Sequence, residues 1–319
     1  MSPTRLQAWA RCPFQHFLSS VLGIAALETP EETDVITALD KGSLVHGILE
    51  EFLSEAIAKG PPKPDEPWSA ADHARLRQIA QGAFADVEAR GLAGRPLLWS
   101  LERDAILDDL AEFLRADSGM RKELGSTPWR VEMAFGFEAD GPGFDEHEEG
   151  GLTLAFRGLI DRVDKTADGG ALVLDYKTGG ASFYSGLEDD PVDHGKLLQL
   201  PVYGLAAREV LGEDAVIRSA YWFVSEKGGF VRRPRAPLSL EAAMPRFREV
   251  VGTIASGIAA GYFPANPGPA KGNCRFCDFD RVCPSRRDAV WERKRKDARL
   301  AGYVALADGD AAAEGEGAQ

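Results

Sequence analysis

Four cysteines place the strongest constraint on how this 319-residue chain can fold. Three of them lie close together near its end, spaced Cys274-x2-Cys277-x5-Cys283, and the fourth, Cys12, lies near its start. Four thiolates suit either an iron–sulfur cluster or a zinc ion, although zinc sites usually present two close pairs of ligands. If all four bind one centre, that centre joins the two ends of the fold as a clasp.

The composition limits the class of protein. Hydrophobic residues make up 44% of the chain and charged residues 27%, which is ordinary for a globular protein. No apolar run reaches the roughly 20 residues of a membrane helix, and the N-terminal segment lacks the apolar stretch of a secretory signal. We therefore expect a cytoplasmic protein without a membrane partner, whose cysteines bind metal rather than form disulfides.

The net charge of −13 argues against a surface that coats nucleic acid without specificity. It leaves room for a local basic channel or for an acidic metal site that acts on phosphates. Basic residues gather in the stretch 281–299, which is interpreted either as part of such a channel or as a solvated helix face.

Hydrophobic periodicity predicts an α/β protein. Helical spacing covers the segments 3–19, 40–58, 69–90, 101–116, 195–211 and 239–260. Strand patterns cover the segments 127–137, 152–165, 171–179, 215–225 and 228–234. Short turns predict two antiparallel hairpins, one joining 152–165 to 171–179 and one joining the last two strands. The order predicts one domain over 1–300, with a mixed central sheet flanked by helices, a helical insertion at about 60–125, and a disordered tail over 301–319.

The segment LDYKTG (174–179) carries the sharpest local signal for chemistry. Asp175 and Lys177 are two residues apart on a predicted strand, so their side chains project from the same face. The preceding apolar run indicates a buried strand, where an unpaired charge is costly. The two side chains therefore pair with each other, as in a common strand-end salt bridge, or with a ligand.

A second carboxylate, Asp161, ends the apolar run of the preceding strand. The predicted hairpin brings it close to Asp175, and two neighbouring carboxylates repel unless a cation lies between them. Oxygen ligands at such a site suit Mg²⁺ or Mn²⁺. Asp164 is a competing candidate for this carboxylate, but it lies nearer the hairpin loop and is interpreted as a turn residue. Glu132, on the first strand, is either an auxiliary acid or a solvent-facing residue.

Three further polar residues are uninformative in isolation. His46 lies on the predicted helix 40–58, and most single helix histidines are structural. Gln199 and Tyr203 are four residues apart and share one helix face, as a half-buried polar pair would.

Taken together, these pieces follow a known order. The segments GSLVH (42–46), GLID (158–161), LDYKTG (174–179) and QLPVY (199–203) resemble the motifs of RecB-type nucleases of the PD-(D/E)XK superfamily. The four cysteines and the opening SPTRLQAWARCPFQHFL resemble the iron–sulfur branch of that family. This branch includes the nuclease domains of AddAB-type helicase–nucleases (AddB-like) and CRISPR-associated exonucleases. The resemblance covers residues 2–290, and it departs at Ile160, which stands where many members have proline.

The resemblance implies a restriction-endonuclease-like fold and assigns roles to particular residues. Lys177 would activate the attacking water and stabilise charge on the phosphate, while Gln199 and Tyr203 would orient the site and contact the DNA backbone. The divalent metal would be bound by His46, Asp161, Asp175 and the backbone carbonyl of Tyr176. A 4Fe–4S cluster would be bound by Cys12, Cys274, Cys277 and Cys283.

The function implied is that of a Mg²⁺- or Mn²⁺-dependent deoxyribonuclease in DNA repair or recombination, acting as an exonuclease on single strands or frayed ends. The alternatives are a catalytically silent module that binds DNA or a helicase, a CRISPR-associated end-processing nuclease, and a zinc-stapled binding protein. A silent module would have lost part of the motif set, and none is missing. The sequence has no Walker-type G-x4-G-K-[ST] motif, so we expect any helicase motor to be a partner in trans.

Overall fold

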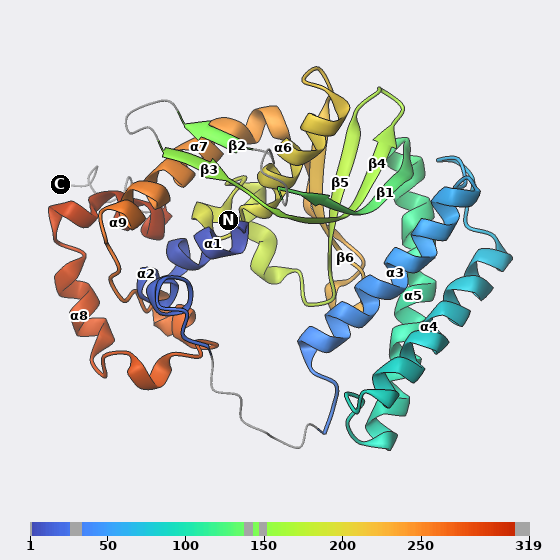
Figure 1. Cartoon of the computed structure of the whole chain (residues 1–319), viewed down its shortest axis with the longest axis horizontal. Coiled ribbons are helices and arrows are strands. Elements are labelled where there is room, and N and C mark those ends of the chain that lie inside the picture. The colour runs from blue at the N-terminus through green and yellow to red at the C-terminus, as the bar shows by residue number, and fades with distance from the viewer. Residues whose placement is uncertain (1, 26–33, 137–142, 147–151, 310–319) are drawn as a thin grey trace.

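A five-stranded sheet forms the centre of the protein in its computed structural model, which describes residues 2–25, 34–136, 143–146 and 152–309 (Figure 1). Its strands lie in the order β1-β4-β5-β6-β7, in which β5 and β6 are parallel and the other neighbours are antiparallel. Their bounds are β1 Ser126–Phe135, β4 Gly158–Thr166, β5 Ala171–Lys177, β6 Ile217–Phe223 and β7 Arg232–Ser239. The predicted mixed sheet and both predicted hairpins, β4–β5 and β6–β7, are confirmed.

Strand β5 is buried along almost its whole length. It pairs with a strand on each side, and residues 171–176 are all buried. Because successive side chains alternate between the two faces, Leu172 and Leu174 enter one hydrophobic core and Val173 enters the other. A continuous apolar run is what a strand covered on both faces requires. The run ends at the strand terminus, where Asp175 and Lys177 lie.

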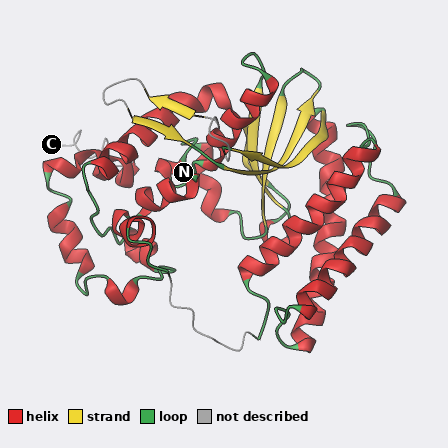
Figure 2. Cartoon of the chain, in the orientation of Figure 1, coloured by secondary structure: helices red, strands yellow, loops and turns green. Residues whose placement is uncertain are grey.

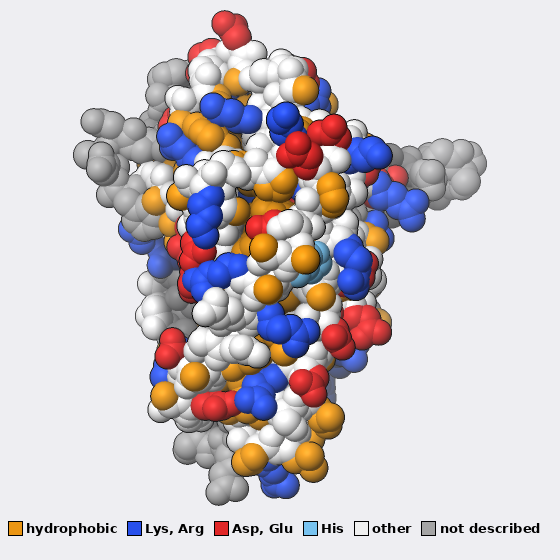
Figure 3. Space-filling model, turned by 90° about the vertical axis from the view of Figure 1, so that its right-hand side faces the viewer, with side chains coloured by type: hydrophobic (Ala, Val, Ile, Leu, Met, Phe, Trp, Pro, Cys, Tyr) orange, Lys and Arg blue, Asp and Glu red, His pale blue; other side chains and the backbone are white. Residues whose placement is uncertain are grey.

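Helices cover both faces of the sheet and give three layers (Figures 1 and 2). One layer consists of α3 Ala38–Lys59, α4 Ala70–Ala89 and α5 Pro96–Leu124. The side chains of Thr37 and Ser69 cap the N-termini of α3 and α4, and left-handed Gly125 (φ 60°) ends α5. On the outer side of this layer, acidic and basic side chains are interspersed (Figure 3). Among the described residues, no helix combines the length and apolarity that a membrane span requires.

The layer on the other face contains both ends of the described chain (Figure 1). It consists of α1 Pro3–Arg11, α2 Pro13–His16, α6 Gln199–Leu211, α7 Leu240–Ala259, α8 Arg287–Lys294 and α9 Ala301–Asp308. Trp9 packs so tightly on Gly257 of α7 that a Cβ there would lie 2.2 Å from the indole ring. The indole Nε1 donates to the carbonyl of Tyr262 at 3.1 Å. The first helix is therefore fixed against the C-terminal part of the chain.

Asp164 is fully buried, which shows that its interpretation as a turn residue was wrong. Its carboxylate accepts hydrogen bonds from Arg162 Nε at 2.6 Å and from Ser126 Oγ at 2.9 Å. Arg162 also donates from Nη1 to Asp117 of α5 at 2.6 Å, and the side chains of these three charged residues are 0% exposed. Burial of the charges is tolerable because each has a partner. This network ties the helical layer to β4, one residue beyond Asp161.

The predicted strand 152–165 is divided in the structure. Residues Leu152–Ala155 form β3, which pairs with β2 Gly143–Glu146 in a separate antiparallel ribbon, and the sheet strand β4 begins at Gly158. Between them, Phe156 is buried with its ring 6.3 Å from that of Phe247. Anchoring this side chain in the core separates the two strands, which the apolar pattern alone did not indicate.

The predicted disordered tail is wrong for residues 301–308, which form α9. Tyr303 and Leu306 are buried in the core, and the Tyr303 ring lies edge-on to Trp9 with centroids 5.0 Å apart. Its hydroxyl accepts a hydrogen bond from Asn266 Nδ2 at 2.8 Å. Two apolar residues in a segment rich in alanine and glycine are enough to dock the helix. Residues 310–319 lie outside the described part of the chain.

Candidate active site

The motif carboxylates meet at the end of the β4–β5 hairpin. In the register of this pair, Arg162 lies opposite Leu174, so Asp161 and Asp175 are the next residues along. Asp161 Oδ2 accepts a hydrogen bond from the backbone N–H of Tyr176 at 2.6 Å. This bond fixes the Asp161 carboxylate against the strand that carries Asp175, as the hairpin prediction requires.

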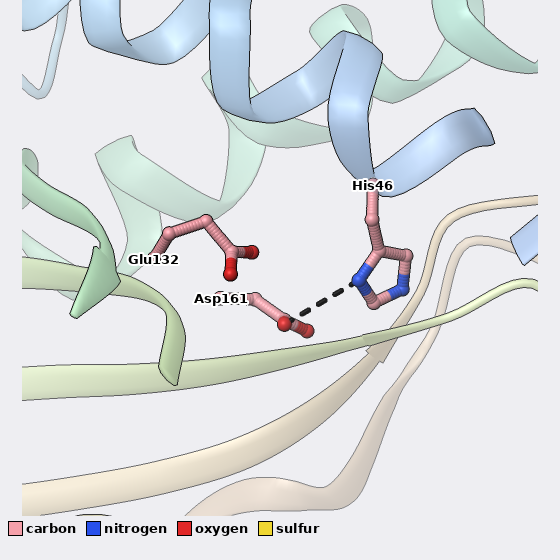
Figure 4. A group of neighbouring side chains, drawn as sticks. All are labelled: His46, Glu132 and Asp161. Atoms are coloured by element: carbon pink, nitrogen blue, oxygen red, sulfur yellow. Dashed lines mark ion pairs between the residues drawn. The ribbon is translucent and has the colours of Figure 1, made fainter. Parts of the chain in front are cut away.

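Three side chains from different elements form a candidate metal centre (Figure 4). They are His46 of α3, Glu132 of β1 and Asp161 of β4, and their ligand atoms all lie within 4.8 Å of one another. His46 Nδ1 lies 3.4 Å from Asp161 Oδ1. All three side chains are half-buried.

Glu132 belongs to this centre because of its backbone. Its neighbours Val131 and Met133 pair with Arg162 and Ile160, so Glu132 faces Asp161 across the β1–β4 ladder. It has a left-handed conformation with φ 45°, which is unusual for a non-glycine residue inside a strand. From the sequence, Glu132 is either an auxiliary acid or a solvent-facing residue. Its position between the strand residues Val131 and Met133 does not by itself indicate that it faces Asp161.

The electrostatics of the site indicate an excess of negative charge. Burial and the nearby carboxylates of Asp161 and Glu50 raise the pKa of Glu132 to about 7. Burial also raises the pKa of Asp175 to about 6, where the charge of Lys177 opposes the shift and that of Asp161 adds to it. For His46, burial lowers the pKa, but the hydrogen bond to Asp161 and the carboxylate charges outweigh burial and raise it. A cation would relieve this crowding of carboxylates.

Asp175 and Lys177 form a close ion pair on one face of β5, as their spacing predicts. The Lys177 ammonium lies 5.1 Å from the ring centroid of Tyr221. Burial lowers the pKa of Lys177, but the charge of Asp175 outweighs it, so the net shift is upward. Asp175 Oδ2, the oxygen nearest the ammonium, is buried and accepts no well-oriented hydrogen bond in the described structure. A carboxylate oxygen has two lone pairs, so this atom can also bind a further cation.

Gln199 and Tyr203 of α6 complete the group. Gln199 Nε2 lies 3.2 Å from Asp175 Oδ1 and 3.1 Å from the hydroxyl of Tyr203, so it bridges the two side chains. Burial and the charge of Asp175 raise the pKa of Tyr203, which keeps its hydroxyl neutral. The structure thus brings all the sequence-predicted site residues from 46 to 203 to one end of the sheet, and it adds Glu132 to them.

Cys12 is far in sequence from the other three cysteines but lies on a segment that contacts theirs. It separates α1 from α2, whereas Cys274 ends the short helical turn Pro269–Cys274 after α7, and Cys277 and Cys283 follow in the loop beyond it. Burial raises the pKa of the Cys283 thiol, and the neighbouring thiols of Cys12, Cys274 and Cys277 add to this shift. Asn273 Nδ2 donates to the carbonyl of Arg11 at 2.8 Å, which joins the two segments directly. The segment that carries Cys12 and the segment that carries Cys274 are therefore neighbours in the fold. Among the described residues, the side chains close enough together to hold a metal do not include the four thiols.

Comparison with known proteins matches residues 1–284 to the PD-(D/E)XK nuclease superfamily. The chain is 29% identical over 201 residues to an ATP-dependent helicase/deoxyribonuclease subunit of Clostridium perfringens, which covers 59% of this chain and 16% of that protein. It is 30% identical over 219 residues to the corresponding helicase/deoxyribonuclease subunit of Symbiobacterium thermophilum, which covers 65% of this chain and 17% of that protein. The chain is also 33% identical over 159 residues to the Gene 69 protein of Mycobacterium phage D29, which covers 48% of this chain and 47% of that protein.

The chain spans about a sixth of the length of the helicase/deoxyribonuclease relatives. The superfamily match, in contrast, extends over nearly all of it and includes the four motif segments. The mixed sheet, its two helical layers and the carboxylate–lysine pair at the end of β5 agree with this match. As its motifs predicted, the chain belongs to the PD-(D/E)XK nuclease superfamily.

Proposed function

We propose that this protein is a DNA nuclease that uses Mg²⁺ or Mn²⁺ to hydrolyse phosphodiester bonds. The strongest support is the group formed by His46, Glu132 and Asp161, whose ligand atoms lie within 4.8 Å of one another. Together with Asp175 it offers three carboxylates and one imidazole, an oxygen-rich donor set that suits these cations. The buried Oδ2 of Asp175, which accepts no well-oriented hydrogen bond, fits the same interpretation.

The ion would be held by His46, Glu132, Asp161, Asp175 and the backbone carbonyl of Tyr176. A divalent cation supplies an activated water and neutralises charge on the phosphate. Lys177, held beside Asp175, would position the water and stabilise the charge that develops on the phosphate oxygens. Its ammonium is kept charged by that carboxylate, whose charge raises the pKa of the lysine, so this role persists at neutral pH.

Gln199 and Tyr203 would act on the site and on the DNA backbone. Gln199 holds Asp175 through a hydrogen bond, which fixes the carboxylate for metal binding. The neutral hydroxyl of Tyr203 can donate to a phosphate oxygen, because its raised pKa retains the proton at neutral pH.

We further propose that the enzyme degrades DNA from an end, on single strands or frayed duplexes, in repair or recombination. The names of the relatives, which combine a helicase with a deoxyribonuclease, support this pathway. A helicase that supplies the unwound strand is the partner that we propose, in keeping with the names of these relatives.

The four thiols fit a 4Fe–4S cluster, which we propose as the clasp between the two ends of the fold. Soft thiolate ligands suit such a cluster, and the hydrogen bond from Asn273 to the carbonyl of Arg11, which holds the segment of Cys274 against that of Cys12, supports a common centre. The visible absorption of anaerobically purified protein, with iron and zinc analysis, tests this assignment. One equivalent of zinc without iron would replace the cluster by a zinc clasp.

The nuclease assignment is tested with end-labelled single- and double-stranded DNA in Mg²⁺ or Mn²⁺. We expect Asp175→Ala and Lys177→Ala to abolish cleavage while circular dichroism and the unfolding temperature stay close to wild type. Lys165→Ala is the matched control, because that lysine also lies over an aromatic ring, 4.6 Å from the centroid of Trp129, at the other end of the hairpin. Wild-type protein that binds DNA but never cleaves it would instead be a silent binding module.

A further inference from the structure

An exposed aromatic side chain lies on the segment that follows β5, the strand that carries Asp175 and Lys177. Phe183 is 50% exposed and belongs to the short helical turn Ser182–Glu188, six residues beyond Lys177. A single exposed apolar side chain is common in proteins. Beside this one lies a cation from a distant part of the chain, because the guanidinium of Arg11 is 5.4 Å from the centroid of its ring.

The exposure of Phe183 is imposed by its neighbour. The ring of Tyr184 packs between the core side chains Tyr221 and Phe223, with centroids 4.8 Å and 5.1 Å away. Phe183 and Tyr184 meet edge to face at 5.6 Å. Because Tyr184 anchors the turn inside the protein, its neighbour is held outward in a fixed position rather than on a loose loop.

A continuous set of contacts links this pair to the catalytic lysine. The Lys177 ammonium lies 5.1 Å from the ring of Tyr221, and Tyr221 contacts Tyr184, which contacts Phe183. Burial raises the pKa of Tyr184, and the charges of Lys177, Asp175 and Arg11 all act on its phenol. The charge of Arg11 and the charges of two active-site residues therefore act on the same tyrosine side chain.

Arg11 is also free to bind an anion. Within the part of the chain that the structure describes, it forms no ion pair with a carboxylate. Its backbone carbonyl accepts a hydrogen bond from Asn273, so the end of α1 that carries it is fixed. A fixed aromatic ring beside an unpaired guanidinium offers a stacking surface for a base and a charge for a phosphate.

We propose that Phe183 and Arg11 form a binding subsite for single-stranded DNA, which stacks on the base and contacts the phosphate of a nucleotide near the scissile bond. This inference rests on the proposed nuclease function. Every base has a π-face, so the subsite does not discriminate sequence, and a base inside a paired duplex cannot reach the ring. The subsite would therefore favour unpaired strands and set the distance between the stacked base and the cleaved phosphate.

The test measures kcat/KM on a labelled single strand in which one abasic residue is moved through successive positions. For wild type we expect an abasic residue at one position near the cleaved bond to lower kcat/KM by about 5- to 150-fold, as the loss of one stacked base predicts. On the intact strand, Phe183→Ala should have the kcat/KM that wild type shows with the abasic residue at that position. Placing the abasic residue there should not lower the kcat/KM of Phe183→Ala any further. Phe183→Trp should restore both the rate and the abasic penalty.

Two further variants separate stacking from charge and from surface effects. Arg11→Ala should weaken DNA binding and reduce the slope of log Kd against log salt concentration by about 0.7, the value for one contact with single-stranded phosphate. Phe276→Ala is the matched control, because Phe276 is 85% exposed and also lies beside a guanidinium, that of Arg275, at 5.3 Å. It should leave the abasic profile unchanged.

The outcomes distinguish this inference from the function on which it rests. If the wild type neither cleaves nor binds DNA, the proposed nuclease function fails. If the wild type cleaves DNA and Phe183→Ala keeps the rate and the abasic profile of wild type, the subsite is wrong while the nuclease function stands.

Discussion

Metal binding by this site should depend steeply on pH, because Glu132, Asp175 and His46 must each lose a proton to bind a cation. The pKa of Glu132 is raised to about 7 and that of Asp175 to about 6, and the pKa of His46 is raised as well. A cation binds the ionised carboxylates, so it must displace any proton that they hold. At pH 6 about one tenth of Glu132 and about half of Asp175 would be ionised, against about nine tenths and nearly all at pH 8.

These fractions give the size of the effect. The form with both carboxylates ionised rises from about 5% to about 90% between pH 6 and pH 8, so the carboxylates alone should raise the affinity for Mn²⁺ by about 20-fold. At pH 6 they should release about 1.4 protons per bound ion, and His46, whose raised pKa keeps it protonated at that pH, adds to both effects. Glu132→Gln should remove a factor of about ten from the rise in affinity.

Isothermal titration calorimetry with Mn²⁺, in two buffers of different ionisation enthalpy, measures both the affinity and the protons released. Glu241→Gln serves as a control because that carboxylate is 81% exposed and far from the site in sequence and fold. An affinity that does not change between pH 6 and pH 8, or a Glu132→Gln variant with the wild-type slope, would refute the assignment of Glu132 to the metal site.

The same shifts determine how stability depends on pH without metal. Both folded pKa values lie above those of an unfolded chain, so the protonated carboxylates favour the folded state. This contribution is fully present below about pH 4 and is lost as the pH rises through about 6 for Asp175 and about 7 for Glu132. The rise in unfolding temperature caused by Mn²⁺ should therefore be larger at pH 8 than at pH 6.

Three other outcomes are expected. Arg162→Leu should lower the free energy of unfolding by about 3–5 kcal/mol, because it leaves the buried carboxylate of Asp164 without its cation, whereas Asp117 keeps its ion pair with Arg121. Arg218→Leu, which breaks the exposed pair with Asp168, should cost about 0–1 kcal/mol. Equal losses in urea denaturation would contradict the network. Gln199→Ala should lower kcat by about 10- to 100-fold, the loss expected for a hydrogen bond to a charged group, and an unchanged kcat would exclude a role in holding Asp175. Cys277→Ser should lower the unfolding temperature and the content of bound metal, while the fraction of the variant that still folds should keep its nuclease activity. A variant with normal metal content and stability would rule out the clasp.

The parts of the fold that could be predicted are those in which neighbouring residues determine the outcome. The apolar run before Asp175 specified a strand covered on both faces, and the turn before it specified the hairpin that brings Asp161 to the same end. His46 lies far away in sequence, and only the joint order of the motif segments indicated that it belongs to this site.

The errors arose where a distant partner decides the outcome. The nearness of Asp164 to the hairpin loop suggested a turn residue, but its partner Arg162 is held by Asp117 of a different element, and no local pattern indicates such a buried network. Glu132 was ambiguous because its direction depends on a left-handed backbone that alternation does not foresee. The helix at 301–308 is stabilised by Tyr303 packing on Trp9, a contact between opposite ends of the sequence.

The wide separation of the cysteines has a consequence for how the protein is made. Cys274 follows Cys12 by 262 positions in the sequence. At a synthesis rate of about 5–20 residues per second, the ribosome takes about 13–52 s to pass from one to the other. Throughout that time Cys12 is a lone thiol whose partners do not yet exist. Any group held by all four thiols is therefore installed after nearly the whole nuclease body has been translated, and a prematurely terminated chain cannot retain it.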